Sequence, residues 1–154
     1  MELMRRRFHF VLALLAWLPV AAALAAQDRP NVPAPQHIVA EIQQALDAAI
    51  SRFHAMDEAG VLAHVSAQYR TGTLTKAGIA DQLRAVFTIH DQVRARVRID
   101  DVLMVGEHAW VYSTGEVIGR LRLVGSWIVV MSWERELEVA RRENGRWRLY
   151  GYQQ

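Results

Sequence analysis

Hydrophobic and polar residues alternate along residues 127 to 152, near the end of the chain. This period of two predicts a long half-buried strand, a tight turn and a final strand. The turn is predicted at Asn144-Gly145, a pair that favours tight hairpins. One face of the long strand carries Trp127, Val129, Met131, Trp133, Leu137 and Val139, and the other carries Ser132, Glu134, Glu136 and Glu138. The first face is therefore expected to be the buried one.

The length of the turn decides which face of the final strand is buried. A two-residue loop would pair Glu143 with Arg146 and place Trp147 on the glutamate face, whereas a three-residue loop keeps Trp147 on the apolar face. The longer loop places two arginines opposite each other, which costs roughly 0.2–1 kcal/mol. Burying a large apolar side chain is worth about 1.5–3 kcal/mol. We therefore predict the three-residue loop Glu143-Asn144-Gly145.

Helical periodicity predicts three helices before the sheet. Apolar residues recur at helical spacing in residues 36 to 56, which indicates one long amphipathic helix. Asp57 is predicted to cap a short second helix, and Thr75 a third helix that ends near His90. Gly72 marks the break between the second and the third helix.

Everything after His90 has the pattern of a sheet, with a first turn at Gly106-Glu107. Both faces of the middle strands carry apolar or aromatic residues, among them Trp110 and Tyr112. A sheet covered by helices on one side usually presents a polar second face to water. The aromatic residues on that second face therefore predict a protein partner, and we expect a homodimer formed through the outer sheet face.

The first 26 residues have the three regions of a secretory signal peptide: Arg5-Arg6-Arg7, an apolar run, and small residues with an A-x-A site at Ala23 to Ala25. The alternative is an uncleaved membrane anchor, because residues 8 to 26 are just long enough to span a bilayer. Pro19 and the alanine-rich tail favour cleavage, a periplasmic or secreted protein, and no stable membrane insertion after cleavage. Residues 27 to 35 contain three prolines and predict a flexible lead-in to one domain, residues 36 to 154.

Charge and cysteine content narrow the function classes. The chain has 18 basic and 16 acidic residues, and removal of the leader leaves 15 of each. Without a net positive charge, binding of nucleic acid loses its main support. The chain has no cysteine, so neither a disulfide nor a lipid-modified cysteine is available.

Three helices followed by a curved antiparallel meander resemble the nuclear transport factor 2-like superfamily, which includes SnoaL-like and ketosteroid isomerase-like proteins. The resemblance covers residues 36 to 153. It depends on Gly72-Thr73-Leu74-Thr75-Lys76-Ala77-Gly78-Ile79, on Val105-Gly106-Glu107-His108-Ala109-Trp110-Val111 and on Asn144-Gly145-Arg146-Trp147-Arg148-Leu149. It implies an α+β fold, with three helices packed on a curved antiparallel sheet to form a cone that can hold a pocket, and it implies no particular activity.

The isomerases of this superfamily place a carboxylate base and a tyrosine donor inside the cone. Asp101 is the only carboxylate that continues the inner stripe of its predicted strand, but it follows Asp100, where a bulge is expected. The bulge, with nearby arginines satisfying both aspartates, is favoured over a role in chemistry. His54 and His64 lie on or beside helix faces, which favours packing over catalysis.

Arg135 is an exception on the apolar face of the long strand, because a guanidinium there needs a polar partner. One interpretation is an arginine at the rim of the sheet, or one paired with a glutamate. The other is an anion anchor inside the cone. In the second interpretation, the ligand-binding residues are Arg135, Tyr69, His90, Trp127 and Trp133.

We expect the protein to bind a small, partly apolar ligand in the cone, and an anionic one if Arg135 is the anchor. An isomerase or polyketide cyclase-like enzyme, which would need an acid–base pair in the cavity, and a non-catalytic dimeric scaffold remain alternatives. No histidine pair has metal-ligand spacing, and no nucleophile elbow, phosphate loop or Cys-His set is present, so neither a metal nor a cofactor is predicted.

Overall fold

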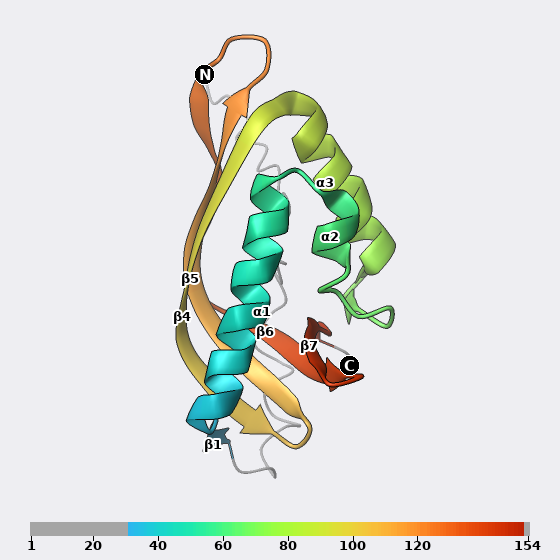
Figure 1. The fold of residues 1–154 in the computed structure, drawn as a ribbon, viewed down its shortest axis with the longest axis vertical. Coiled ribbons are helices and arrows are strands. Elements are labelled where there is room, and N and C mark those ends of the chain that lie inside the picture. Colours follow the sequence, from blue (N-terminus) through green and yellow to red (C-terminus); the bar gives the residue numbers. More distant parts are fainter. Residues whose placement is uncertain (1–30, 153–154) are drawn as a thin grey trace, which may run out of the picture.

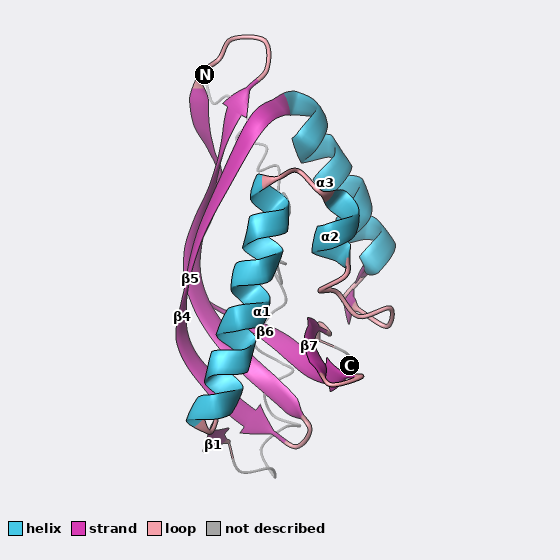
Figure 2. Ribbon diagram, viewed as in Figure 1, coloured by secondary structure: helices cyan, strands magenta, loops and turns pink. Residues whose placement is uncertain are grey.

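The computed structural model describes residues 31–152, and three helices lie on one side of a strongly curved antiparallel sheet (Figures 1 and 2). The elements in chain order are β1 Val32–Pro33, α1 Gln36–His54, α2 Glu58–Leu62, β2 Arg70–Thr71, β3 Leu74–Thr75, α3 Lys76–Ile89, β4 His90–Val105, β5 His108–Leu121, β6 Trp127–Glu143 and β7 Arg146–Leu149. The predicted α+β cone is thereby confirmed. The predicted signal peptide, residues 1 to 26, lies outside the described residues.

The main sheet has the strand order β1-β4-β5-β6-β7, and β2 and β3 form a separate small hairpin. The long strands β4, β5 and β6 bend around α1, which lies along their concave face (Figure 1). The part of the proline-rich lead-in that the structure describes is extended. It is attached to the sheet, because Val32 pairs with Met104 and Pro33 with Leu103.

The helix starts predicted from capping residues are confirmed. The carboxylate of Asp57 accepts a hydrogen bond from the Gly60 backbone N–H at 2.9 Å, and the Thr75 hydroxyl accepts one from Gly78 at 3.3 Å. The third helix ends at Ile89, next to the predicted end at His90. These short polar side chains satisfy backbone donors that would otherwise lack a partner in the first helical turn.

The predicted three-residue loop between β6 and β7 is wrong. Glu143 pairs with Arg146, so the loop has only two residues. Asn144 and Gly145 have φ angles of 51° and 77°, and two consecutive left-handed residues form the turn that best matches the twist of a hairpin. The local preference of Asn-Gly decides the turn, and the burial of Trp147 is achieved elsewhere in β6.

A bulge in β6 reverses which of its side chains face the helices. Trp133 lies opposite Gly115 and Glu136 lies opposite Ser113, so two β6 residues face the single residue between them on β5. One of these two, Arg135, has a φ of 46°. The face that begins with Trp133 therefore continues with Glu136 and not with Arg135. A second bulge, predicted at Asp100, is confirmed between Ile99 and Asp101.

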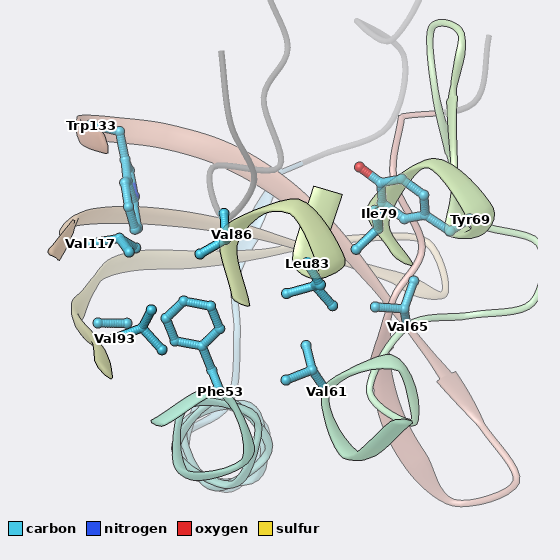
Figure 3. Packing of buried hydrophobic residues seen from close by; sticks show 11 residues of the cluster. Phe53, Val61, Val65, Tyr69, Ile79, Leu83, Val86, Val93, Val117 and Trp133 are labelled. Atoms are coloured by element: carbon cyan, nitrogen blue, oxygen red, sulfur yellow. The ribbon is translucent and has the colours of Figure 1, made fainter. Parts of the chain in front are cut away.

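The core fills the space between the helices and the concave face of the sheet. Phe53 of α1 points toward the sheet and packs in one buried cluster with Val93, Val117 and Trp133 (Figure 3). Leu83 of α3, which has no exposed surface, belongs to the same cluster. A second cluster surrounds Ile42, Val102, Val111 and Trp147 near the other end of α1. The region between these clusters is not completely filled.

Candidate functional site

An apolar pocket lies between α1 and the concave face of the sheet and has a volume of about 170 Å³. Its apolar walls come from α1, α2, β4, β5, β6 and β7. They include Ile42, Leu46, Ile50, Phe53, Val97, Ile99, Val111, Trp133, Trp147 and Leu149. Four polar or charged residues also line it: His64, Ser113, Glu138 and Arg148. Such a mostly apolar concavity with few polar groups is typical of small-molecule sites.

The bulge at Arg135 places Glu138 in this pocket. The Arg135 backbone N–H donates to the hydroxyl of Thr114 at 3.0 Å, which holds the extra residue against β5. Beyond the bulge, Glu138 lies opposite Val111, and both residues line the pocket. The alternation along β6 predicted Glu138 on the outer face, so the sequence pattern did not mark it as a functional residue.

Glu138 is the strongest candidate for chemistry because its carboxyl group is held in apolar surroundings. Within residues 31–152 the structure gives the carboxyl neither a hydrogen bond nor an ion pair. Burial, and to a smaller extent the nearby charge of Glu136, raises the pKa of Glu138 well above its usual range. A carboxyl with a raised pKa keeps its proton at higher pH and can act as a hydrogen-bond donor or acid.

His64 is the second titratable group of the pocket, and it follows α2. Burial, with the positive charge of Arg148 as the next cause, lowers the pKa of His64. The imidazole therefore favours its neutral form, in which one ring nitrogen can accept a proton. His54, by contrast, has the packing role expected of it, because its Nε2 accepts the backbone N–H of Ala95 at 2.9 Å.

The pocket wall beside Trp133 is held by a side-chain hydrogen bond. The indole N–H of Trp133 donates to the Ser113 hydroxyl at 3.1 Å. Gly115 lies under the same indole ring, since a Cβ at Gly115 would be 2.5 Å from the Trp133 side chain and 2.6 Å from the Arg96 carbonyl oxygen. Glycine at this position therefore lets Trp133 lie flat against β5.

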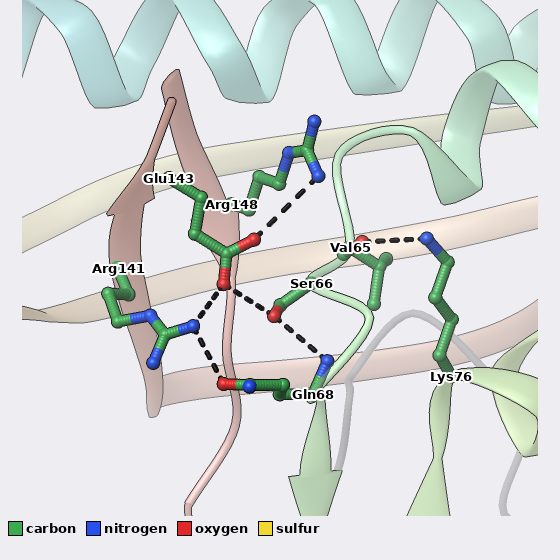
Figure 4. Close-up of polar contacts among 7 residues, drawn as sticks. All are labelled: Val65, Ser66, Gln68, Lys76, Arg141, Glu143 and Arg148. Atoms are coloured by element: carbon green, nitrogen blue, oxygen red, sulfur yellow. Dashed lines mark hydrogen bonds and ion pairs between the residues drawn. The ribbon is translucent and has the colours of Figure 1, made fainter. Parts of the chain in front are cut away.

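A polar network around Glu143 ties the segment after α2 to β6 and β7 (Figure 4). The Ser66 hydroxyl donates to Glu143 at 2.6 Å, and Arg141 and Arg148 reach the same carboxylate at 2.5 and 3.7 Å. The hydrogen bond from Ser66 and the bond from Arg141 lower the pKa of Glu143. Because His64 precedes Ser66 by two residues, this network fixes the position of its backbone relative to the strand that carries Glu138.

Arg135 lies outside the pocket, so its predicted position on the inner face is wrong. Its side chain is 60% exposed and lies 3.7 Å from the carboxylate of Asp101. Its guanidinium also stacks over the ring of Tyr112, 5.1 Å from the centroid. The physical reason is the bulge, which turns the arginine to the outer face and leaves it paired at the surface, where such a pair is weak.

The other four predicted ligand-binding residues are not brought together. Trp133 lines the pocket, but Tyr69 is 2% exposed within the core cluster. His90 is 4% exposed, and its Nδ1 donates to the Val86 carbonyl at 2.9 Å. Trp127 lies in the β5–β6 hairpin under the guanidinium of Arg94, 4.6 Å from its ring centroid. A role in ligand binding stays a prediction for these residues.

Glu138 also acts electrostatically on Tyr69. Burial raises the pKa of Tyr69, and a negative charge on Glu138 raises it further. The phenol is therefore neutral at physiological pH and lies within electrostatic reach of the pocket carboxyl.

Among the described residues no cluster of His, Asp and Glu could hold a metal ion. None of the helices in the same range is long and apolar enough to cross a membrane.

Solved structures share this fold. A scytalone dehydratase-like protein from Novosphingobium aromaticivorans DSM 12444 superposes with a TM-score of 0.65 at 10% identity, over 75% of this chain and 81% of that one. A ketosteroid isomerase-like protein from Erwinia carotovora atroseptica SCRI1043 gives 0.56 at 20% identity, over 73% and 90%. ActVI-ORFA from Streptomyces coelicolor gives 0.61 at 18%, over 76% and 93%.

At these identities the similarity concerns the fold. No protein-family model and no curated protein sequence matches the chain. The function must therefore be inferred from the arrangement of side chains in the pocket.

Proposed function

Because the chain has the fold of the nuclear transport factor 2-like superfamily, we propose that its pocket binds a small, mostly apolar molecule through a hydrogen bond from Glu138. The observation that carries this proposal is the unpaired carboxyl of Glu138, whose pKa is raised by its apolar surroundings. A protonated carboxyl donates one hydrogen bond. The matching ligand group is a carbonyl or another neutral acceptor.

The pocket volume limits the size of the ligand. An apolar protein cavity of about 150 Å³ can hold a benzene molecule. The present pocket, with about 170 Å³, therefore suits a compact body of one or two rings. The anionic preference inferred from Arg135 loses its basis, because that side chain lies on the outer face.

The pair indane and indan-1-one tests the hydrogen bond, because the two compounds differ by a carbonyl group. A hydrogen bond worth about 0.5–1.5 kcal/mol predicts that the ketone binds about two- to tenfold more tightly than the hydrocarbon. Titration calorimetry with the parent, Glu138→Leu and Glu138→Gln measures this ratio. We expect the ratio to disappear in Glu138→Leu, which cannot donate, and to persist in Glu138→Gln, whose amide can.

The pH dependence provides a second readout for the same ligand pair. In the parent, preference for the ketone should be lost as the pH rises through the raised pKa of Glu138, since the carboxylate cannot donate. In Glu138→Gln the preference should not change with pH. Arg135→Met is the matched control and should bind like the parent. Loss of binding in this variant, or an unchanged ratio in Glu138→Leu, would overturn the assignment.

Acid–base catalysis is the second candidate function, and the neutral imidazole of His64 in the same pocket favours it. Such a pair could move a proton next to a carbonyl. His64 would accept the proton from carbon, and the hydrogen bond from Glu138 to the carbonyl oxygen would stabilise the resulting enolate until the carbon is reprotonated. The dehydratase-like and isomerase-like names among the structural neighbours are compatible with this class of chemistry.

Exchange of the hydrogens next to the carbonyl of indan-1-one in D₂O, followed by NMR, tests the catalytic candidate. The parent should accelerate exchange over buffer, and His64→Gln should remove the acceleration while still binding the ketone. No acceleration by the parent would exclude this reaction on a ketone that binds. Binding itself is decided by the calorimetric experiment.

Export and assembly are further parts of the proposal. The leader of residues 1 to 26 supports a protein of the periplasm or the exterior.

On the outer sheet face, Trp110 contacts the ring of Tyr152 with centroids 5.8 Å apart and remains partly exposed. Together with Tyr112, it supports a homodimer through this face.

A further inference from the structure

The β5–β6 hairpin ends in an exposed group of large apolar side chains. The exposed fraction of these residues is 96% for Leu123, 68% for Val124, 40% for Trp127, 41% for Ile128 and 61% for Val129. We call these five residues the apolar tip. Figure 1 shows the hairpin extending past α3 at one end of the molecule. Because exposed apolar groups of this extent mark interaction sites, the apolar tip indicates a binding surface.

The tip is held in place by backbone hydrogen bonds at its base. The Leu121 N–H donates to the Ser126 carbonyl at 2.9 Å, and the Gly125 N–H donates to the Leu121 carbonyl at 2.7 Å. The guanidinium of Arg122 donates to carbonyls at the end of α3, including that of His90 at 2.9 Å. The hairpin is thus fixed to the helix. Its backbone therefore loses little conformational entropy when the apolar side chains bind a partner.

Apolar side chains are exposed on both faces of the hairpin. Ile128 lies opposite Gly119, which belongs to the inner stripe of β5, whereas Trp127 and Val129 lie opposite Arg120 and Ile118 on the outer face. A flat protein partner would cover only one of these faces. A surrounding apolar medium would cover both, as the acyl region of a lipid layer does for an inserted segment.

Arginines surround the base of the tip. Arg94 lies over the Trp127 ring, Arg122 lies at the end of α3, and Arg120 is paired with Asp91 at 2.8 Å. These four charged residues carry a net positive charge. Basic side chains near a membrane surface are attracted to anionic headgroups, and tryptophan favours the interface between headgroups and acyl chains. The charge thus complements an anionic lipid surface.

A second copy of this chain is a weaker match for the tip. A stable protein interface uses about 20–30 residues a side, and the apolar tip offers five on a narrow projection. We propose that the apolar tip inserts peripherally and reversibly into an anionic lipid surface, with Leu123 and Val124 among the acyl chains and the arginines at the headgroups. This surface is separate from the pocket and does not depend on the proposed ligand.

A single labelled cysteine can test the insertion, because the full chain contains none. Val124→Cys carries a fluorophore at the tip, and Glu107→Cys carries the same fluorophore in the β4–β5 turn, at the other end of these strands. Each labelled full-length protein is mixed with vesicles of phosphatidylcholine, with or without phosphatidylglycerol. Nitroxide-labelled acyl chains in the vesicles quench only a fluorophore that enters the bilayer.

We expect quenching of the label at position 124, more with phosphatidylglycerol and less at high salt, and little quenching at position 107. Adding Leu123→Glu to Val124→Cys should weaken the binding that produces the quenching by about tenfold or more. An unquenched tip label would overturn the proposal, and so would equal quenching at both positions, which a membrane-bound leader alone could produce. Shielding of the tip label without vesicles, in step with dimer formation by sedimentation, would also overturn it and assign the tip to a second copy.

Discussion

Replacing Glu138 with leucine is expected to stabilise the fold, because the carboxyl lies in an apolar pocket without a partner among the described residues. A buried polar group without a hydrogen bond costs about 1–3 kcal/mol. Leucine removes this cost and adds apolar surface, whereas its branched shape costs up to about 1 kcal/mol in imperfect packing. The free energy of unfolding should therefore rise by about 1–2 kcal/mol.

This gain corresponds to a measurable shift in melting temperature. At about 2.1 cal/mol/K per residue, unfolding 122 residues has an entropy near 260 cal/mol/K. Each kcal/mol then moves Tm by about 4 °C, so we expect a rise of about 4–8 °C in a calorimetric scan. Glu136→Leu is the matched control, since Glu136 is exposed on the same strand and its replacement should change stability by at most about 0.5 kcal/mol.

The stability gained by Glu138→Leu over the parent should increase with pH. The folded-state pKa of Glu138 is raised above its unfolded value, so folding is favoured while the carboxyl is protonated and disfavoured as the pH rises through the raised pKa. Leucine does not titrate, and the difference between variant and parent should be larger at about pH 8 than at about pH 5. A lower Tm for Glu138→Leu, or a gain that does not change with pH, would refute the reasoning. It would mean that the carboxyl is stabilised by partners and ionised in the folded protein.

Three other outcomes are expected. Gly145→Ala should lower stability by about 1–2 kcal/mol in denaturant unfolding, because φ is 77° and no other atom lies within 4 Å of the added Cβ, so the cost is conformational; an unchanged midpoint would contradict this account of the turn. The exported protein should begin at Ala26 or Gln27 by intact mass, and retention of Arg5-Arg6-Arg7 would support an anchor instead. Trp110→Glu should convert a sedimenting dimer to monomers, and a parent that is monomeric at micromolar concentration would exclude the outer-face interface.

Local signals predicted the helix starts and the positions of the turns, although not the length of the last turn, because each depends on a few neighbouring residues. The caps at Asp57 and Thr75 and the turn at Asn144-Gly145 were identified from side chains that satisfy the backbone or tolerate a positive φ. The order of helices and strands followed from hydrophobic periodicity. These features made the cone fold predictable without knowledge of the pocket.

The candidate site was not predictable in the same way, because it depends on the bulge at Arg135. The bulge is held by Thr114, which lies on another strand, and no period in the sequence marks it. The preference of Asn144-Gly145 for a two-residue turn was the available signal. With that turn, Trp133 and Trp147 can both face the helices only if β6 gains an extra residue between them. The inward position of Glu138 follows from the same constraint.

The bulge at Arg135, a left-handed residue, separates two segments of β6 whose alternation is in opposite phase. Deletion of Arg135 would remove the bulge and keep Glu136 and Glu138 on the inner face, because Glu134 alone would then face Thr114 on β5. A regular strand that kept all of its residues would instead place Leu137 and Val139 on the inner face in place of Glu136 and Glu138. Such a strand would have the same number of residues, and the helices would pack against it in the same place. The acidic character of the pocket therefore depends on the extra residue beside Thr114, and the same sequence in a regular strand would give this part of the pocket an apolar wall.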